Sequence, residues 1–250
     1  MADLGQLRAK IGPRGYVRCS GGALLLLLTV SFLPAWADHL NLPVGRLNHA
    51  GYKHLQHCTA TLVAPQVAVT ALHCLVPSDV PNMHLLLGYD RGSWNEHLQP
   101  VTAVSASSPG DIAILCLDRP STVEPVPTAV RPADRGEAVL VVGYGKPRVQ
   151  VANHTACRVV DFDEQGVFQL DCPLTSGASG APVLRETETG YEIIGIVSAT
   201  NSTRSVAYWF GGEDGVAACN PALQSKPGAY RVEKSKPDAN DKAKRVTQLP

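Results

Sequence analysis

Thr175-Ser-Gly-Ala-Ser-Gly-Ala-Pro-Val183 is the most informative stretch of this 250-residue chain. Glycines stand two residues before and one residue after Ser179, which permits a tight turn whose backbone N–H groups point one way. Such a turn holds the Ser179 hydroxyl outward, and the N–H groups of Gly177 and Ser179 form an oxyanion hole. A G-x-S-G sequence also fits an ordinary loop, so the catalytic interpretation requires a base elsewhere in the chain.

His73 is the candidate base, because it lies in Val69-Thr-Ala-Leu-His-Cys74, directly after a β run and before a cysteine. Cys58 stands sixteen residues before Cys74, and a bridge between them would attach the loop that carries His73 to its neighbouring strand. The other histidines are interpreted as ordinary surface or core residues: His39, His49, His54, His57, His84, His97 and His154.

A catalytic histidine also needs a carboxylate that orients the imidazole and stabilises its charged form. Asp111 opens the run Asp-Ile-Ala-Ile-Leu-Cys-Leu117 and places a charge at the end of an apolar strand. An acid in that position is usually a turn residue, but the presence of a base and a nucleophile favours the catalytic role.

Composition excludes some classes of protein. The 22 Lys+Arg balance the 22 Asp+Glu, and no long basic run is present, which argues against nucleic-acid binding through phosphate contacts. With 44% hydrophobic and 18% charged residues the chain is not disordered as a whole. Its length permits one large domain or two small ones.

Short β runs separated by turn residues, with almost no helical periodicity, predict an all-β sandwich or barrel. The predicted strands are His57–Val63, Met83–Gly88, Val101–Ser105, Ile112–Leu117, Ala138–Tyr144, Cys157–Phe162, Val167–Cys172, Ala181–Arg185, Tyr191–Ala199 and Ser205–Trp209. Four prolines between Arg119 and Gly136 indicate a connection between two β units. The chain is predicted to divide into an N-terminal segment 1–37, a first β unit 38–118, the connection 119–136, a second β unit 137–224 and a polar, lysine-rich tail over 225–250.

The N-terminal segment 1–37 has the pattern of a secretory signal. Four basic residues precede the apolar run Ala23–Leu33, and Pro34 and Ala35-Trp36-Ala37 follow it. An N-terminal anchor is the alternative, but the run is shorter than the roughly 20 apolar residues of a membrane-spanning helix. Cleavage near Ala37 would export the protein, to the periplasm or the medium, and would leave six cysteines, which suggests disulfides.

The order His73, Asp111, Ser179, in the contexts T-A-L-H-C, D-I-A-I-L and G-A-S-G-A-P-V, resembles a trypsin-like (chymotrypsin-fold) serine protease. Cys58-Thr-Ala-Thr-Leu-Val-Ala-Pro65 and Val142-Gly-Tyr-Gly145 support the resemblance, which runs from about Gly45 to Trp209. It implies two antiparallel six-stranded β-barrels packed perpendicular, with the active site in the cleft between them. His73 and Asp111 would come from the first barrel and Ser179 from the second.

The chain also departs from the digestive members of that family. They carry an aspartate before the nucleophile, which binds a newly cut N-terminus; here that position is Ala178. The short loops resemble the compact secreted bacterial branch that includes glutamyl endopeptidases, which implies a Cys157–Cys172 pair. Cys116 and Cys219 are then left: Cys116 is interpreted as a thiol buried in its strand, and a bridge to Cys219 is the alternative.

By the same resemblance, Pro173 forms the base of the primary specificity pocket, and Ser198-Ala199-Thr200 forms its wall. Proline carries no charge, so the aspartate that would select Lys or Arg is missing. Thr200 would narrow the entrance, and Val197 replaces the histidine of glutamyl endopeptidases. Small or medium uncharged side chains are the expected substrates; Arg204 is either solvated or a contact for an acidic side chain.

The sequence therefore predicts a secreted, monomeric serine endopeptidase that acts on polypeptides and needs neither a metal nor another cofactor. No nucleic-acid partner and no membrane span in the mature form are expected. A catalytically idle binding module with the same fold is the alternative. The acidic cluster Asp161, Asp163 and Glu164 is interpreted as a solvated turn in preference to a calcium site.

Overall fold

The computed structural model of the protein describes residues 42–49, 57–75, 77–105, 110–201, 203–211 and 217–219. Regular structure within these ranges consists of thirteen β-strands and three short 3-10 turns, so the all-β prediction is confirmed. No helix in this part of the chain is long and apolar enough to span a membrane. The predicted signal over 1–37 and the predicted tail over 225–250 lie outside the described residues.

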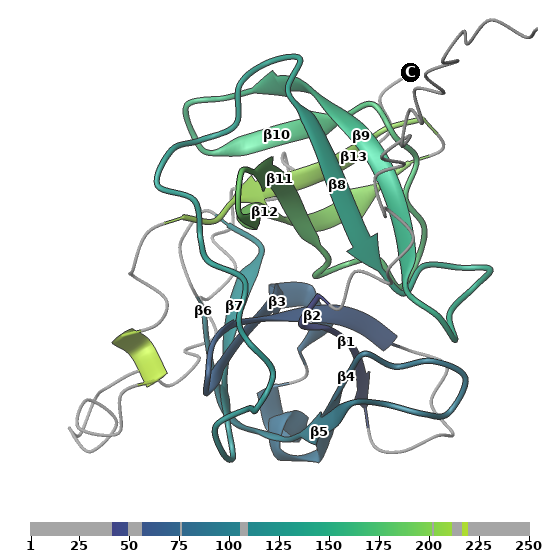
Figure 1. The fold of residues 1–250 in the computed structure, drawn as a ribbon, viewed down its shortest axis with the longest axis vertical. Helices are drawn as coiled ribbons and strands as arrows, with labels where there is room; N and C mark the ends of the chain where they lie inside the picture. The colour runs from purple at the N-terminus through teal and green to yellow at the C-terminus, as the bar shows by residue number, and fades with distance from the viewer. Residues whose placement is uncertain are drawn as a thin grey trace, which may run out of the picture. The chain divides into compact units, whose positions relative to one another are not determined.

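The first sheet is antiparallel and contains seven strands in the order β5-β4-β1-β2-β3-β7-β6 (Figure 1). The two strands at the ends of this order, β5 and β6, are separated by Gln99 alone. The chain itself therefore joins the two edges, and the sheet curls into a barrel. Its strands are β1 (Val44–His49), β2 (His57–Ala64), β3 (Val67–Ala71), β4 (Met83–Leu87), β5 (Glu96–Leu98), β6 (Pro100–Ser105) and β7 (Ile112–Leu117).

The second sheet is a closed antiparallel barrel in the order β10-β13-β12-β11-β8-β9. Its strands are β8 (Ala138–Gly143), β9 (Asn153–Phe162), β10 (Val167–Leu170), β11 (Pro182–Thr187), β12 (Gly190–Thr200) and β13 (Ser205–Trp209). The prediction of two antiparallel barrels is thus confirmed; the second has the expected six strands, whereas the first has seven, because the segment between β4 and β6 adds the short strand β5. Each predicted strand has a counterpart, although β9 begins at Asn153, four residues earlier than expected.

Strand β7, which directly follows Asp111, is apolar throughout. Successive side chains of a strand point to opposite faces. Ile112 and Ile114 accordingly pack in a hydrophobic cluster that draws on both barrels, whereas Ala113 and Leu115 face the interior of the first barrel. Because both faces are buried, the run lacks the apolar–polar alternation of a half-exposed strand.

Strands β1, β3 and β5 are absent from the predicted set, although the run before His73 indicated β3 without giving its bounds; each absence has a physical reason. Strand β1 contains Gly45 and polar residues, so its composition does not indicate a strand. Gly45 is nonetheless suited to its place, since a Cβ there would lie 2.5 Å from the Leu85 side chain. The short β3 is buried at all five positions and shows no alternation, and β5 is only three residues long.

The segment predicted as the connection, 119–136, contains no strand, and it contacts both barrels. The Val126 N–H donates to the carbonyl of Leu62 in the first barrel at 3.1 Å. Soon afterwards the Ile193 N–H, in the second barrel, donates to the carbonyl of Pro127 at 2.8 Å. Backbone hydrogen bonds therefore tie this proline-rich segment to each barrel in turn.

Candidate active site

The pairing of β3 with β7 brings His73 and Asp111 together. In this antiparallel pair Ala71 lies opposite Ile112, so the residues just beyond, at the same end of both strands, become neighbours. A 3-10 turn over Leu72–Cys74 ends β3, and the Leu72 N–H donates to the Asp111 carbonyl at 3.1 Å. The register of the two strands therefore places the backbones of His73 and Asp111 next to each other.

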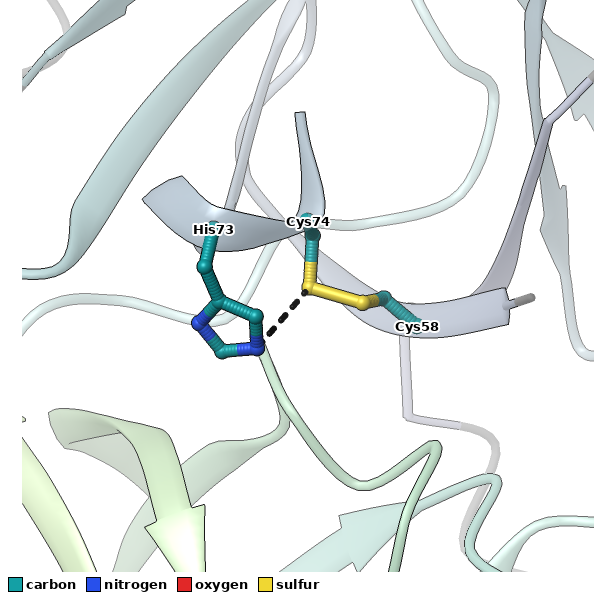
Figure 2. Close-up of side chains that lie close together, drawn as sticks. All are labelled: Cys58, His73 and Cys74. Atoms are coloured by element: carbon teal, nitrogen blue, oxygen red, sulfur yellow. Dashed lines mark hydrogen bonds between the residues drawn. A yellow bond between two sulfur atoms is a disulfide. The ribbon is translucent and has the colours of Figure 1, made fainter. Parts of the chain in front are cut away.

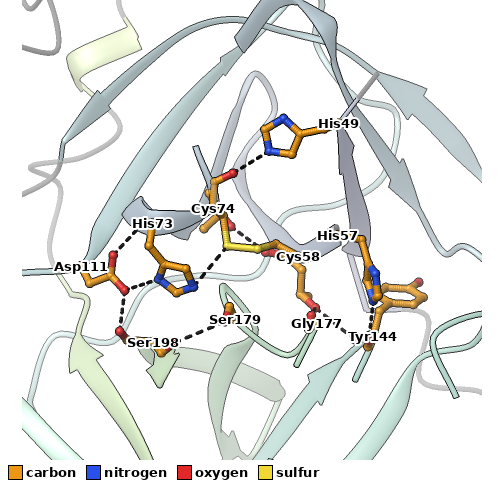
Figure 3. The surroundings of a disulfide bond; sticks show 12 residues. His49, His57, Cys58, His73, Cys74, Asp111, Tyr144, Gly177, Ser179 and Ser198 are labelled. Atoms are coloured by element: carbon orange, nitrogen blue, oxygen red, sulfur yellow. Dashed lines mark hydrogen bonds and ion pairs between the residues drawn. A yellow bond between two sulfur atoms is a disulfide. The ribbon is translucent and has the colours of Figure 1, made fainter. Parts of the chain in front are cut away.

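The Asp111 carboxylate holds His73 through both of its oxygens (Figure 3). The imidazole Nδ1 lies 2.6 Å from Oδ2, and the backbone N–H of His73 donates to Oδ1 at 2.8 Å. The imidazole Nδ1 is the donor, so Nε2 is the nitrogen that accepts a proton. The His73 side chain is 48% exposed and that of Asp111 is 20% exposed, so the imidazole is accessible to a substrate.

Ser198 is a further member of this cluster, and the sequence analysis placed it only in the pocket wall. Its Oγ donates to Asp111 Oδ2 at 2.5 Å, and its carbonyl accepts from Ser179 Oγ at 3.3 Å. Ser198 therefore links the carboxylate of the first barrel to the serine of the second (Figure 3). Its place on β12, far from Asp111 in sequence, left no local pattern that indicates this contact.

The turn that carries Ser179 has the predicted glycine geometry. Gly177 has φ +101° and Gly180 has φ +82°, conformations that other residues adopt only with strain. The N–H groups of Ala178 and Ala181 are used within the turn, where they donate to the carbonyls of Thr175 and Ala178 at 2.9 Å. Those of Gly177 and Ser179 donate to no acceptor within the described ranges, which leaves both available for an anionic oxygen.

Ser179 and His73 are not hydrogen-bonded to each other in this state. Ser179 Oγ donates to the Ser198 carbonyl, and the nearest partner of His73 Nε2 among the described residues is Cys74 Sγ, at 3.9 Å. Figure 3 shows the Ser179 side chain beneath the Nε2 edge of the imidazole. Contacts between nucleophile and base are often long in free enzymes and tighten when substrate binds.

His73 and Asp111 each stabilise the charged form of the other. The hydrogen bond with Asp111 raises the pKa of His73 above its usual value, burial opposes this, and the negative charge of Asp111 adds to it. Burial acts to raise the pKa of Asp111, but hydrogen bonds from His73 and Ser198 outweigh it and hold that pKa below its usual value. The pair therefore favours an ionised carboxylate next to the imidazole.

Comparison with known proteins identifies the family. A model of the trypsin-like peptidase domain matches residues 58–196, which is more than half of the chain. The chain belongs to the trypsin-like peptidase family. The crystal structure of a thermostable serine protease, AL20, from an extremophilic microorganism superimposes with a TM-score of 0.58 at 20% sequence identity. That match covers 74% of this peptidase and 99% of the other chain, and at this identity it supports the fold alone.

The six cysteines of the described residues form three disulfides. Cys58 is bonded to Cys74 and Cys157 to Cys172, the pairs that the sequence analysis expected, and Cys116 is bonded to Cys219, the pair that it left open. The first lies beside His73, whose ring together with the two sulfurs forms a compact group within 4.8 Å (Figure 2). Sulfurs in a disulfide are not thiolates, so this group is not a metal site.

The residues expected in the specificity pocket fall into two places. Pro173 lines a cavity of about 220 Å³ together with Ala178 and residues of β8, β9 and the loop between these strands. Ser198, Ala199 and Thr200 do not line this cavity. Thr200 Oγ1 instead donates to the Leu174 carbonyl at 2.7 Å and so connects the two segments that were expected to form the pocket.

Arg204 and Asp163, for each of which the sequence offered two roles, make hydrogen bonds within the protein. The Arg204 guanidinium donates to Gln169 Oε1 at 3.0 Å, in an exposed position. The backbone N–H groups of Gln165 and Val167 donate to Asp163 Oδ1 at 3.0 and 2.8 Å, as in a tight turn. Asp163 therefore satisfies backbone donors, in line with the solvated-turn interpretation.

Proposed function

We propose that this peptidase is a serine endopeptidase that hydrolyses polypeptides through an acyl-enzyme intermediate on Ser179. The observation that carries the proposal is the convergence of a carboxylate-bound imidazole, a serine in a glycine turn and two N–H groups that donate to no acceptor among the described residues. Chain segments about a hundred residues apart supply these groups, and together they have the composition of an acyl-transfer site.

Each group has a role in the proposed reaction. His73 Nε2 removes the proton from Ser179 Oγ as the oxygen attacks the peptide carbonyl carbon. The N–H groups of Gly177 and Ser179 stabilise the negative charge that develops on the carbonyl oxygen. Asp111 holds the imidazole in the correct tautomer and stabilises the imidazolium, which then protonates the departing amine. Water then attacks the acyl carbon with His73 as the base, the bond to Ser179 Oγ breaks, and the carboxylic acid is released.

Substrates with small or medium uncharged side chains fit the proposed site best. Pro173 offers no charge at the expected base of the pocket, and the Thr200 hydroxyl, bonded to the Leu174 carbonyl, connects the expected wall directly to the segment of that base. A panel of peptide esters that differ only in the residue before the cleaved bond tests this. Preference for Ala or Val over Arg, Glu and Trp is expected, and a preference for any of these three would contradict it.

Export is the second part of the proposal. The apolar run Ala23–Leu33 with its basic flank has the pattern of a cleaved signal, and three disulfides are typical of oxidising compartments. N-terminal sequencing of the accumulated protein is expected to begin near Asp38. We also propose that the mature protein is a monomer without a metal or another cofactor.

A fluorophosphonate probe tests the central claim, because it labels only an activated serine. Labelling of Ser179 is expected in the wild-type protein and is expected to be lost in S179A and in H73A. The matched control is S176A, which removes a neighbouring serine from the same turn and is expected to label normally. A wild-type protein that folds but takes no label would favour the idle binding module.

A further inference from the structure

The turn that carries the nucleophile is held by a residue of the other barrel. Residues 175–181, named here the oxyanion loop, receive hydrogen bonds from Thr59 on β2. Thr59 directly follows Cys58, is 0% exposed, and belongs to neither the triad nor the oxyanion donors.

Thr59 contacts the oxyanion loop at two points. Its hydroxyl donates to the Gly177 carbonyl at 2.8 Å, and its backbone N–H donates to the Ser179 carbonyl, also at 2.8 Å. The same hydroxyl accepts from the Tyr144 N–H at 3.0 Å, so both of its roles are used. Thr70 Oγ1 in turn donates to the Thr59 carbonyl at 2.7 Å, which holds Thr59 itself in place.

Gly177 needs such support because its own structure does not restrain it. A glycine at φ +101° has no Cβ to limit rotation, and no Cβ fits there, since one would lie 2.4 Å from the Tyr144 carbonyl oxygen. Its orientation must therefore be set by its neighbours. The Lys146 N–H donates to the Ser176 carbonyl at 3.1 Å on one side of Gly177, and the Thr59 hydroxyl donates to the Gly177 carbonyl on the other.

These two bonds determine where the Gly177 N–H points. The C=O and N–H of a trans peptide point in opposite directions. With the Ser176 carbonyl directed at Lys146, the N–H of the same peptide unit, that of Gly177, points away from Lys146. The Gly177 carbonyl belongs to the next peptide unit, which the Gly177 Cα joins to this N–H, and the Thr59 hydroxyl holds that unit in place. Loss of the hydroxyl leaves the Gly177 N–H oriented by the bond at Ser176 alone.

We infer that Thr59 is a positioning residue for catalysis, whose hydroxyl orients the Gly177 N–H of the oxyanion hole. The inference rests on the proposed function, because it gives Thr59 its role through that hole. It assigns a second task to the segment next to Cys58, in addition to the attachment of the His73 loop.

The test compares two buried threonines on one strand. T59V removes the hydroxyl with little change of shape, and T59S restores it. T61V is the control, because Thr61 is also on β2 and 0% exposed but its Oγ1 has no hydrogen-bond partner among the described residues. Removal of one oxyanion donor typically costs about 100- to 1000-fold in kcat. We expect roughly a tenfold loss of kcat for T59V, since the donor is misaimed and still present.

Expected results separate positioning from general stability. In T59V, kcat falls while KM stays nearly unchanged. The affinity for a peptide aldehyde inhibitor, whose adduct carries the oxyanion, falls by a similar factor. T59S recovers most of the kcat and most of the inhibitor affinity. T61V leaves both values at the wild-type level. Equal kcat values for T59V and T61V, or a T59S variant no better than T59V, would overturn the inference.

A second measurement does not depend on activity. Amide hydrogen exchange of a peptic fragment that covers 175–181 is expected to accelerate in T59V and to stay at the wild-type rate in T61V. Were the wild-type protein to fail the fluorophosphonate test, the proposed function would fall while the exchange data still decided whether Thr59 holds the loop. Unchanged exchange in T59V would overturn the inference by itself.

Discussion

The disulfides allow stability and catalysis to be separated experimentally. Cys58–Cys74 closes a loop of sixteen residues, whereas Cys116–Cys219 closes one of 103. By chain entropy the first stabilises the fold by about 3 kcal/mol and the second by about 4.7 kcal/mol. The longer bridge is thus expected to contribute more to the free energy of unfolding.

Their effects on activity should have the opposite order. Cys74 adjoins His73 and Cys58 adjoins Thr59, so the short bridge joins the supports of the base and of the oxyanion loop. Cys116 lies near the other end of β7 from Asp111. We expect C58A/C74A to lower kcat/KM by roughly 10- to 100-fold, because displacement of a catalytic group by about 1 Å costs up to about 100-fold. C116A/C219A should keep nearly full kcat/KM.

The assay combines urea unfolding with turnover of an uncharged peptide ester, measured at a temperature at which both variants remain folded. Circular dichroism under the turnover conditions verifies the folded fraction. If C116A/C219A loses activity while C58A/C74A retains it, or if both lose it in proportion to stability, the assignment of a positioning role to the short bridge is wrong.

Three further predictions concern the proposed reaction. S179A and H73A are each expected to lower turnover by about 10⁶-fold and the double variant by hardly more, because nucleophile and base act as one unit; additive losses would contradict this. D111N should cost about 10⁴-fold with the fold intact, since the imidazole loses the acceptor that sets its tautomer. In a pH profile, kcat/KM should fall on the acid side with a midpoint above 6.5, because Asp111 raises the pKa of His73 and the protonated ring accepts no proton. The raised pKa also stabilises the folded protein at low pH, and this stabilisation is lost as the pH rises through the pKa of His73 in the folded state. Finally, Ala178 offers no carboxylate to a new N-terminus, so mature protein with and without an N-terminal tag should turn over alike, and a tagged form that needs proteolysis to become active would refute this.

Much of the architecture was readable from local patterns. The apolar runs that became β7, β8 and β12 predicted strands because their side chains are buried against one or two cores. Strand β1 was not predicted, since its stability comes from pairing with β2 and β4, partners that its own composition does not reveal. Contacts between strands can outweigh local propensity in this way.

In the candidate site, too, some residues were indicated by local patterns and others only by long-range contacts. His73, Asp111 and Ser179 were proposed as the candidate site from the sequence because each lies in a distinctive short motif next to an apolar strand. Ser198 and Thr59 were not recognised as their partners, because the contact of Ser198 with Asp111 and that of Thr59 with Gly177 each span more than 80 positions. Chemical identity and turn geometry are properties of a few adjacent residues, and the sequence carries them. The aim of an N–H group or a hydroxyl depends on how two barrels pack, and only the folded chain decides it.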